Sequence, residues 1–482
     1  MIRHAIAVSL IVAPLPAAAR DARLEARITR LLAERAGPGT RFGLVVVDGG
    51  GREIVAINPD DRFMPASNTK IFTTVAAFAS LPMDAPDTAG GARVRLEGKA
   101  TPDVVLSGHG DARLSSAADC RVDCLAVLAD AVAARTRRVG DVIGDDTAFP
   151  DQRWSAGMSW NNMAGRYGTA TSALTLDDNE WTVTVRPGDA PGAAAVVEGD
   201  GYYRIDNRVV TAAQGDGELS FDRMPGTGML RVEGRVAPGA APRTLRVGVE
   251  DAAHRAAWRL AAMLRARGVR VRGAVMVRHR PATPADDPAK RGGATIERPA
   301  PPPALAALIP PPLGEDMTRI NKESQNLHAE LALRRAGAVA GTGSVADGLA
   351  VVGAVAARAG VPRLAWDLSD GSGMSTYNRV SPRGMVTLLR WVDAQPWGAA
   401  WRATLPVAGV DGTLAKRFKG TPLEGRLFAK TGSLNATNAL AGSMMGRSGG
   451  TLTFAFYAND VPEVVAATKA MDEALVAIAE AS

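Results

Sequence analysis

The sequence contains few cysteines and few histidines, and both shortages exclude classes of protein. Only two of its 482 residues are cysteine, too few for the disulfide framework that holds a small secreted domain together. The five histidines are scattered along the chain, without the close spacing that a histidine-built zinc site needs. We therefore expect a protein that works without a metal ion or another cofactor.

Lysine is also scarce, and basic charge is not concentrated in any run. The chain has 56 basic and 50 acidic residues, a net charge of +6, so nucleic acid is not an expected partner. The hydrophobic fraction of 46% allows large cores and excludes disordered and fibrous classes, and the length predicts roughly two to four folding units. Eight lysines occur, at positions 70, 99, 290, 322, 416, 419, 430 and 469. A lysine found within a motif is therefore less easily explained by chance.

No apolar run reaches the ~20 residues that a membrane-spanning helix needs. The chain begins with the short positive segment Met1–His4, followed by the apolar stretch Ala5–Leu15 and the small residues Ala17–Ala19. These features predict a secretory signal peptide over residues 1–19. The alternative, a buried N-terminal helix, is disfavoured by two prolines near the cleavage point. We expect a periplasmic protein without a firm membrane anchor.

Cys120 and Cys124 are four residues apart in a chain expected to enter an oxidising compartment. They could form a disulfide across one short loop or remain two small buried thiols. The sequence leaves both alternatives open, and neither cysteine has an expected catalytic role.

The two ends of the chain have a similar pattern of expected strands and helices, and the middle has a different one. Arg41–Val47 and Glu53–Ile57 predict a β-hairpin around a glycine turn, and an apolar helix is expected to begin near Pro65. From about residue 90 to 280 the chain contains short strands, glycine turns and two helical stretches. The strands expected there include Trp181–Val185 and Leu230–Val236, and the helices lie near Leu125–Arg137 and Ala252–Arg267.

Two proline-rich segments, Pro281–Pro288 and Pro299–Pro312, mark the return to a region like the first. We predict a discontinuous domain of residues 20–89 and 290–482, interrupted by an accessory region of residues 90–289 that forms two small domains. In its second part we expect helices around Ser324–Arg335 and Val345–Arg358, strands Gly425–Ala429, Asn438–Met445 and Thr451–Tyr457, and a C-terminal helix near Val461–Glu480. The last strands are expected to complete the sheet begun by the hairpin.

Ser67 and Lys70 form a Ser-x-x-Lys motif at the start of the first apolar helix. Residues three apart on a helix share one face, so the two side chains can meet. A serine hydroxyl becomes a nucleophile when a neighbouring base takes its proton, and a lysine serves as that base when burial or another cation lowers its pKa. We expect Lys430 to be that cation. The alternative is an N-capping serine followed by an exposed lysine.

A second motif, Lys430-Thr431-Gly432-Ser433, follows the strand expected at Gly425–Ala429. An edge strand can pair with an extended peptide, and glycine allows the peptide a close approach. Lys430, Thr431 and Ser433 offer donors for a carboxylate. A third motif, Ser324-Gln325-Asn326, is expected at a helix start, where it could equally be an ordinary N-cap.

The three motifs together, in this order, form the serine/lysine constellation shared by penicillin-binding proteins and serine β-lactamases. With the long insertion between the first and second motifs, the chain resembles the D-alanyl-D-alanine carboxypeptidase/endopeptidase family of low-molecular-mass penicillin-binding proteins. Further stretches that resemble this family are Leu106–Asp111, Gly144–Phe149, Asn321–Leu327, Asp370–Ser375 and Gly412–Leu414. The resemblance implies an α+β fold, in which a transpeptidase-like antiparallel sheet flanked by helices is interrupted by a β-rich insertion.

The resemblance also implies a role for each site residue. Ser67 would be acylated, with Lys70 as its base, and Ser324 with Lys430 would pass a proton to the leaving D-alanine. The remaining members would bind substrate: Asn326 its amide, Thr431 and Ser433 its terminal carboxylate, Gly432 its backbone, and the N–H groups of Ser67 and Ser433 its oxyanion. The partners implied are peptidoglycan stem peptides, with β-lactam antibiotics as covalent inhibitors.

The chain departs from the family pattern in the insertion. Some relatives carry an acidic residue near Trp160–Tyr167 that meets the amino group of the substrate side chain, whereas this chain has Asn161-Asn162-Met163. Preference for a diaminopimelate-type side chain is therefore not expected on this basis. Gln325 and Ser433 replace a more usual aspartate and threonine.

Other motifs and functions are weaker interpretations. Gly446-Arg447-Ser448-Gly449-Gly450 matches a nucleophile elbow, but strands on both sides predict a hairpin turn. His328, four residues after Ser324, could lie near the site, but a solvent-facing helix position is favoured. Asp370–Gly373 is expected in a structural loop that borders the site. A serine β-lactamase would need a deacylating device such as Glu-x-x-Leu-Asn, which we do not find. A non-catalytic cell-wall-binding protein would have no need of all the motif residues.

Overall fold

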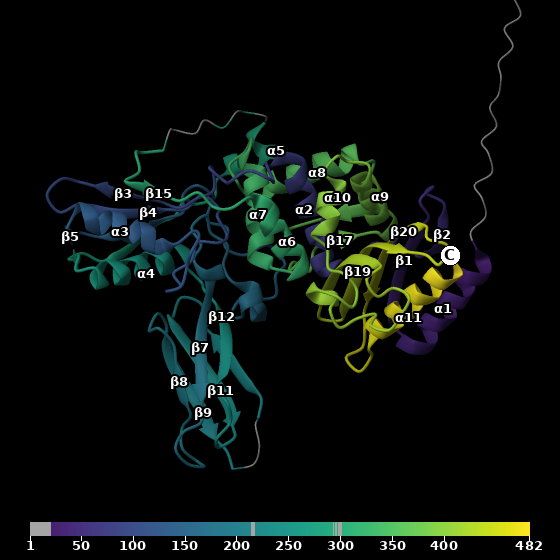
Figure 1. Cartoon of the computed structure of the whole chain (residues 1–482), viewed down its shortest axis with the longest axis horizontal. Helices are drawn as coiled ribbons and strands as arrows, with labels where there is room; N and C mark the ends of the chain where they lie inside the picture. The colour runs from purple at the N-terminus through teal and green to yellow at the C-terminus, as the bar shows by residue number, and fades with distance from the viewer. Residues whose placement is uncertain (1–20, 214–216, 293, 295, 297–300) are drawn as a thin grey trace, which may run out of the picture.

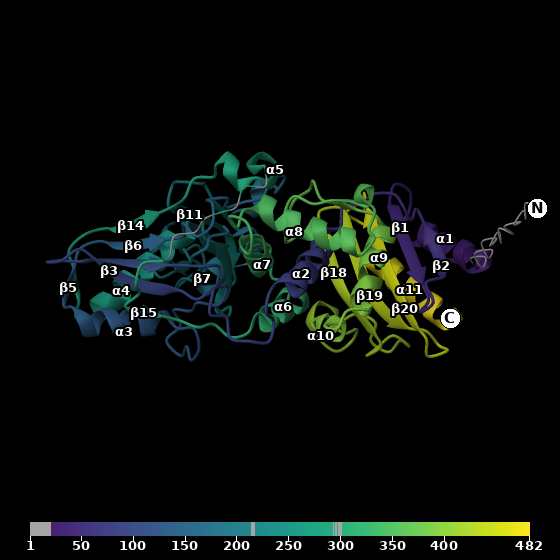
Figure 2. The same ribbon diagram turned by 90° about the horizontal axis from the view of Figure 1, so that it is seen from above.

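The computed structural model describes residues 21–213, 217–292, 294, 296 and 301–482. The expected signal peptide lies outside these residues and stays a prediction. The molecule is elongated, with one sheet and its helices at one end and the inserted region at the other, from which a β-rich arm projects (Figure 1, Figure 2). Within the described residues, no helix combines the length and the apolar character needed to cross a membrane.

A five-stranded antiparallel sheet joins the two ends of the chain. Its strand order is β18-β19-β20-β1-β2. The strands are β1 (Arg41–Val47), β2 (Glu53–Ile57), β18 (Leu427–Leu434), β19 (Thr437–Met445) and β20 (Thr451–Asn459). The junction between the two chain ends is the antiparallel pairing of β1 with β20, in which Val45 lies opposite Ala455. The hairpin and the C-terminal strands therefore share a sheet, as the sequence predicts.

The central strand β1 is buried on both faces, which explains its continuous apolar run. Leu44 and Val46 belong to the core under the terminal helices, whereas Val45 and Val47 belong to the core on the other face, because successive side chains of a strand alternate. The first face is covered by α1 (Ala22–Ala36) and α11 (Ala467–Ala481). The helices toward the second face are α2 (Thr69–Ser80), α6 (Leu313–Lys322), α7 (Asn326–Ala338), α8 (Val345–Arg358), α9 (Pro382–Asp393) and α10 (Gly398–Ala403). The short strands β16 (Trp366–Asp367) and β17 (Arg379–Val380) pair beside them.

The inserted region contains two separate cores. The first lies between helices α3 (Leu125–Arg135) and α4 (Ala252–Ala266) and a sheet of order β14-β6-β4-β3-β15. Its strands are β3 (Arg93–Glu97), β4 (Asp103–Ser107), β6 (Val142–Asp145), β14 (Val275–Arg278) and β15 (Ala306–Ala307), and β5 (Arg138–Val139) pairs with β13 (Arg270–Val271) nearby. The short helix α5 (Pro288–Arg291) lies between β14 and β15 in the chain.

The second core fills the projecting arm in Figure 1, between two three-stranded sheets, and includes Trp181 and Leu230. The strands are β7 (Glu180–Arg186), β8 (Val196–Glu198), β9 (Arg204–Thr211), β10 (Leu219–Arg223), β11 (Met229–Val236) and β12 (Arg243–Gly248). Because β15 pairs with β3, the chain still contributes to the inserted sheet after residue 290. The proposed domain division itself stays a prediction.

Two predicted boundaries are wrong. Strand β18 does not end at Ala429 but continues to Leu434, because Lys430 to Ser433 pair with β19 along the whole motif. Helix α11 begins at Ala467 rather than near Val461, since the chain first makes a turn in which Val465 N–H donates to Pro462 C=O.

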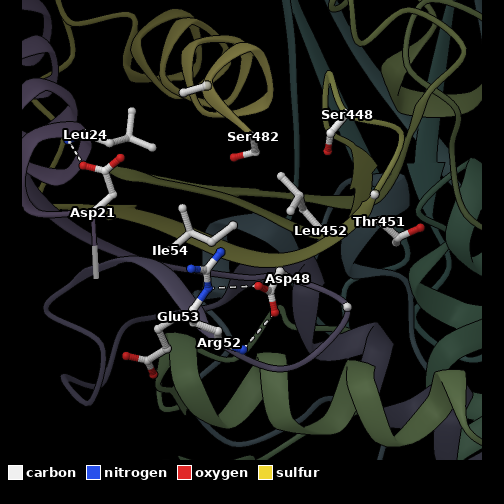
Figure 3. Close-up of a pocket in the computed structure, with 13 residues that line it drawn as sticks. Asp21, Leu24, Asp48, Arg52, Glu53, Ile54, Ser448, Thr451, Leu452 and Ser482 are labelled. Atoms are coloured by element: carbon white, nitrogen blue, oxygen red, sulfur yellow. Dashed lines mark hydrogen bonds and ion pairs between the residues drawn. The ribbon is translucent and has the colours of Figure 1, made fainter. Parts of the chain in front are cut away.

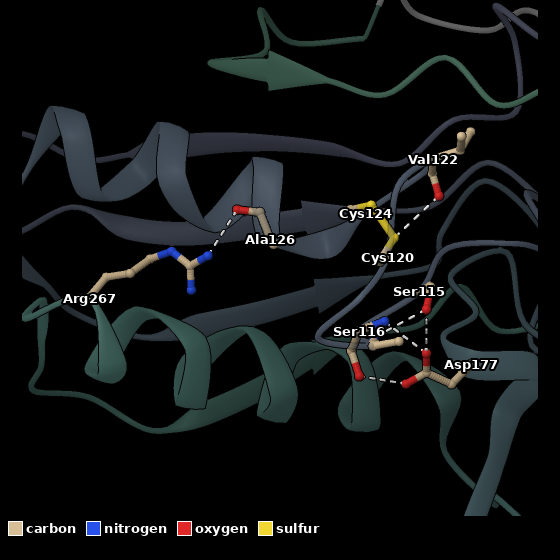
Figure 4. Close-up of a disulfide and its surroundings, with 9 residues drawn as sticks. Ser115, Ser116, Cys120, Val122, Cys124, Ala126, Asp177 and Arg267 are labelled. Atoms are coloured by element: carbon tan, nitrogen blue, oxygen red, sulfur yellow. Dashed lines mark hydrogen bonds between the residues drawn. A yellow bond between two sulfur atoms is a disulfide. The ribbon is translucent and has the colours of Figure 1, made fainter.

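Cys120 and Cys124 form a disulfide, with 5.8 Å between their Cα atoms (Figure 4). The bridged loop leads directly into α3 at Leu125. Just before the loop, the backbone N–H and hydroxyl of Ser116 donate to the Asp177 carboxylate at 2.8 and 2.6 Å. Of the two alternatives that the sequence left open, the structure shows the bridge.

Candidate active site

Ser67 and Lys70 meet at the junction of a 3-10 turn, η1 (Ala66–Asn68), with helix α2. The Lys70 ammonium nitrogen lies 3.0 Å from Ser67 Oγ, and the lysine side chain is completely buried. Its other two contacts are Asn326 Oδ1 at 2.6 Å and the Ser372 carbonyl at 2.5 Å. The predicted pairing of Ser67 with Lys70 is therefore present in the structure.

The surroundings of Lys70 Nζ direct a lone pair toward Ser67. An amide oxygen and a backbone carbonyl can only accept hydrogen bonds, so Nζ must donate to Asn326 and Ser372. A neutral amine has two N–H groups and one lone pair, which leaves the lone pair for the hydroxyl of Ser67. Neutral Lys70 is therefore oriented as a base toward this serine.

Burial lowers the pKa of Lys70 to about 7, although Asp370 and Glu330 act in the opposite direction. The expectation that repulsion from Lys430 also lowers the pKa of Lys70 stays a prediction, because burial is the main cause. The Lys430 pKa is itself lowered well below its usual value, first by burial and then by repulsion from Lys70. Neither ammonium group has a carboxylate in ion-pair contact in the part of the chain that the structure describes.

Lys430 and Ser324 form the second pair of the site. Lys430 Nζ donates to Ser324 Oγ at 2.9 Å and to the Thr431 carbonyl at 3.0 Å. The motif lies at a helix start, as expected: α7 begins at Asn326, and Ser324 lies in the short connection before it, with φ at +60°. This left-handed conformation turns the chain sharply enough for the hydroxyl to reach β18.

Gly432 is required by the approach of β18 to the nucleophile turn. A Cβ atom at this position would lie 2.7 Å from the Pro65 carbonyl and 3.1 Å from the Ser67 nitrogen. Asn68 ties the same segments together, because its side-chain amide donates to the Lys430 carbonyl at 2.6 Å. The glycine thus has a packing reason within the protein, in addition to the expected approach of substrate.

Thr431 and Ser433 lie on the outermost strand of the sheet, β18, which pairs with β19 on one side. On its other side, the only bridge among the described residues joins Val407 to Phe428, before the motif. Thr431 Oγ1 donates to Thr413 Oγ1 at 2.8 Å, and Ser433 is exposed. The structure therefore places both hydroxyls at an accessible edge next to Ser67. Their binding of a carboxylate stays a prediction.

Asn326 connects the site to the inserted region. While its Oδ1 accepts from Lys70, its Nδ2 donates at 2.8 Å to the backbone carbonyl of Tyr167, in the turn η3 (Arg166–Gly168). The contact with Tyr167 orients the amide so that oxygen faces Lys70. Its expected contact with a substrate amide stays a prediction.

Two buried acids that the sequence analysis did not assign support the loop over Lys70. Glu330 accepts from the backbone N–H groups of Gly371 and Ser372 at 3.0 and 2.8 Å, and its pKa is raised to about 7 by burial and by Asp370. Asp370 accepts from the Gly373 and Ser375 N–H groups at 2.9 and 2.6 Å. The sequence did offer one indication of Glu330: it lies four residues after Asn326, so the two side chains share one face of α7.

The alternative nucleophile elbow is excluded. Ser448 lies in the turn between β19 and β20, as predicted, and lines a pocket of about 310 Å³ at another part of the sheet (Figure 3). The residues around this pocket include Asp48, Arg52 and the chain end Ser482, but no histidine. Within the described residues, no group of three or more His, Cys, Asp or Glu is arranged to hold a metal ion.

His328 is not on the solvent-facing position that we predicted. Its side chain has 0% exposure and contacts two aspartates, Asp178 and Asp316. The prediction failed because Asp178 is 150 residues away in the inserted region, and the periodicity of one helix does not show which distant segment packs against it.

The fold and the paired Ser–Lys contacts define a penicillin-binding class of protein. The structure of penicillin-binding protein 4 (dacB) from Haemophilus influenzae has the same fold, with a TM-score of 0.77 and 22% identity over 94% of this chain and 97% of that one. This confirms the predicted fold class.

The chain belongs to the D-Ala-D-Ala carboxypeptidase 3 (S13) family, whose model matches residues 24–481. It is 34% identical to a D-alanyl-D-alanine carboxypeptidase of Actinomadura sp. (strain R39) over 89% of this chain and 80% of the relative. It is also 24% identical to D-alanyl-D-alanine carboxypeptidase DacB of Haemophilus influenzae, over 89% of this chain and 87% of the relative. The family predicted from the three motifs is thus confirmed.

Proposed function

We propose that this protein is a serine D-Ala-D-Ala carboxypeptidase that acts on peptidoglycan stem peptides through an acyl-enzyme on Ser67. The observation that carries the proposal is the environment of Lys70, in which two fixed acceptors leave the amine lone pair for Ser67. With a pKa of about 7, a large fraction of Lys70 is neutral at neutral pH, whereas a solvated lysine would be neutral in under about one molecule in a thousand.

In the proposed acylation, Ser67 Oγ attacks the carbonyl carbon of the penultimate D-alanine and its proton passes to Lys70. The bond from that carbon to the nitrogen of the terminal D-alanine breaks, and the nitrogen takes a proton from the Ser324 hydroxyl. Lys430, 2.9 Å away, returns a proton to Ser324. Repulsion between the two buried ammonium groups favours one proton shared by the pair, which this sequence of transfers conserves. Water then hydrolyses the ester.

The backbone N–H groups of Ser67 and Ser433 are proposed to bind the developing oxyanion. Thr431 and Ser433 would bind the terminal carboxylate, and Asn326 the substrate amide. Pairing of an extended peptide with the free edge of β18 would align these contacts. Asn161 and Asn162 offer no carboxylate at the insertion, so we propose no ionic selection of an amino-bearing side chain there.

We also propose that β-lactams acylate Ser67. A structure of penicillin-binding protein 4 from Haemophilus influenzae complexed with a β-lactam has this fold, with a TM-score of 0.71. The proposed location is the periplasm, on the strength of the charged, apolar and small-residue segments at the N-terminus. Endopeptidase activity on cross-linked peptides is a second candidate, because the edge of β18 is open to an extended chain.

Mass spectrometry after penicillin G treatment tests the proposal. A stable adduct on the peptide that contains Ser67 is expected. Rapid release of that adduct would instead indicate a serine β-lactamase, and no adduct at all would indicate a non-catalytic cell-wall-binding protein. Defined muropeptides then separate removal of terminal D-alanine from cleavage of cross-links.

A further inference from the structure

His328 lies in the first turn of α7, two residues after Asn326, and is enclosed by charged groups from three elements. Its Nδ1 lies 3.0 Å from Asp316 Oδ1 on α6, and its Nε2 lies 3.0 Å from Asp178 Oδ1 of the inserted region. Carboxylate oxygens only accept hydrogen bonds, so both ring nitrogens must donate, and only the protonated imidazolium does so. The geometry therefore defines a buried cation between two anions.

An arginine lies beside each of the two aspartates. Arg319 donates to Asp178 Oδ2 at 2.6 Å, and Arg113 Nε lies 3.3 Å from Asp316 Oδ1. Arg113 also contacts Glu315 at 2.7 Å, which makes three cations and three anions in the cluster. Arg319 Nη1 lies 3.5 Å from His328 Nε2, too far to replace Asp178 as its partner.

The inserted region presents Asp178 from a rigid turn. Asp177, Asp178 and Asn179 are all in the left-handed region, with φ of 50°, 57° and 51°. Asn179 fixes the turn, because its Oδ1 accepts from Leu176 N–H at 3.0 Å and its Nδ2 donates to the Ala170 carbonyl at 2.8 Å. Asp178 is therefore held in place independently of His328.

The cluster controls the corner that carries Ser324. Asp316 lies on α6 before the corner, and His328 lies on α7 after it, so their contact fixes the angle between the two helices. The corner has one left-handed residue, Ser324, and presents Ser324 Oγ to Lys430 and Asn326 Oδ1 to Lys70. A small rotation of α7 would move both contacts.

We infer that His328 is a positioning residue: its imidazolium, held between Asp178 and Asp316, locks the inserted region against the α6–α7 corner and so sets the placement of Ser324 and Asn326. This inference rests on the proposed function for its kinetic consequence, but not for its structural one. Loss of the ring proton removes the histidine donor from one of the two carboxylates, which then keeps only its arginine contact, and the corner loosens.

The direction of the pH dependence follows from the cluster. The two aspartates raise the pKa of His328 above its ordinary value against the effect of burial, while His328 and Arg319 lower the pKa of Asp178. The other titratable groups that face the cluster are Arg113, Glu315 and Glu323, and the carboxyl pair Asp111 and Asp123, which lies beyond Asp316 and has raised pKa values. The lock is therefore complete at mildly acidic and neutral pH and is lost as pH rises through the raised pKa of His328.

The test is the second-order rate of Ser67 acylation by penicillin G from pH 5.5 to 10. Wild-type protein should show a rising limb from Lys70 and a falling limb from His328. Asp178→Asn keeps the size and an acceptor oxygen but removes one negative charge, so the falling limb should move to lower pH by about one unit or more. His328→Gln should remove the falling limb and lower the maximum roughly 10- to 100-fold. His254→Gln, a matched change of a half-buried histidine on α4, should alter neither limb.

Hydrogen exchange of the segment 322–328 provides the readout that does not depend on catalysis. Protection there should fall in wild-type protein between pH 6 and 9, after correction for intrinsic exchange, and should be low at both pH values in His328→Gln. If penicillin G acylates no variant, the proposed function fails while this measurement still decides the lock. A falling limb at the same pH in Asp178→Asn and His328→Gln, or equal protection in all variants, would overturn the inference.

Discussion

The active site and the α6–α7 corner each bury a cationic side chain completely, and they shift its pKa in opposite directions. At the active site, Lys70 and Lys430 contact only hydroxyl, amide and carbonyl oxygens, and the pKa of both is lowered. At the α6–α7 corner, His328 contacts two carboxylates, and its pKa is raised. Burial disfavours the charge in both places, so the charge of the partners decides the outcome. The neutral form is therefore favoured for Lys70, and the charged form for His328.

The largest effect is expected when the nucleophile itself is removed. Ser67→Ala should abolish acylation by penicillin G and leave the fold intact, since it removes one partly exposed hydroxyl and no apolar contact. Lys70→Ala should lower the acylation rate by about 10²–10⁴, the typical contribution of a general base. Ser448→Ala is the control, because it changes a turn serine far from Lys70. Adduct formation in Ser67→Ala, measured by mass spectrometry, would contradict the assignment.

A carboxylate beside Lys70, like those beside His328, should raise the pKa of Lys70 instead of leaving it lowered. Asn326→Asp places a carboxylate where Asn326 Oδ1 now accepts from Lys70 at 2.6 Å. The pKa of Lys70 should rise by roughly one to three units, so acylation at pH 7 should fall about 10- to 1,000-fold and recover at higher pH. The pH profile of acylation measures this. Asn162→Asp, the same substitution without contact to Lys70, is the control, and an unmoved limb in Asn326→Asp would mean that Lys70 is not the titrating base.

Lys430→Gln separates burial from repulsion at the active site. Because burial is the main cause of the lowered Lys70 pKa, the rising limb should stay near pH 7. The rate should fall by roughly 10² as the proton path through Ser324 is lost. Lys290→Gln, at an exposed lysine paired with Asp287, should retain the wild-type rate. A rising limb displaced toward the pKa of free lysine would show that repulsion from Lys430 lowers the pKa of Lys70.

Stability should respond to pH in opposite directions at the two places. His328 has a raised pKa in the folded protein, so its contribution is complete below its unfolded pKa of about 6.5 and is lost as pH rises through the folded value. Lys70 has a lowered pKa and costs stability below about pH 10, most of all below pH 7. Denaturant unfolding of wild-type protein and His328→Gln at pH 6 and 9 should give a difference in unfolding free energy that is larger at pH 6. An equal difference at both pH values would contradict a charged His328.

The smallest effect on catalysis is expected from the disulfide. Cys120→Ser opens a loop of only a few residues, for which loop-closure entropy gives about 2 kcal/mol. The loop belongs to the inserted region and supplies no residue that contacts Ser67, Lys70, Ser324 or Lys430, so acylation should remain within about twofold of wild type. Thermal unfolding measures the first effect and penicillin G kinetics the second; a large loss of acylation would show that the loop supports the site.

Local patterns were sufficient for much of the fold and for the choice of candidate site residues that the structure brings together. The hairpin of β1 and β2, the nucleophile turn and the turn at Ser448 follow from alternation, helix periodicity and glycine. The same patterns missed the extension of β18 through Ser433, because the polar motif looks like a strand end although its backbone pairs with β19. They also missed the left-handed Ser324, since serine and asparagine are common at ordinary helix starts.

The sequence by itself determined which residues could do chemistry: three motifs, in one order, name a serine, two lysines and their polar neighbours. Only the tertiary structure decided how those groups ionise. The pKa of Lys70 is lowered because folding removes water from it and supplies two neutral acceptors. The pKa of His328 is raised because folding brings Asp178 to it from the inserted region. A pKa depends on solvation and on charges within a few ångströms, and these are properties of the packed chain rather than of neighbours along it.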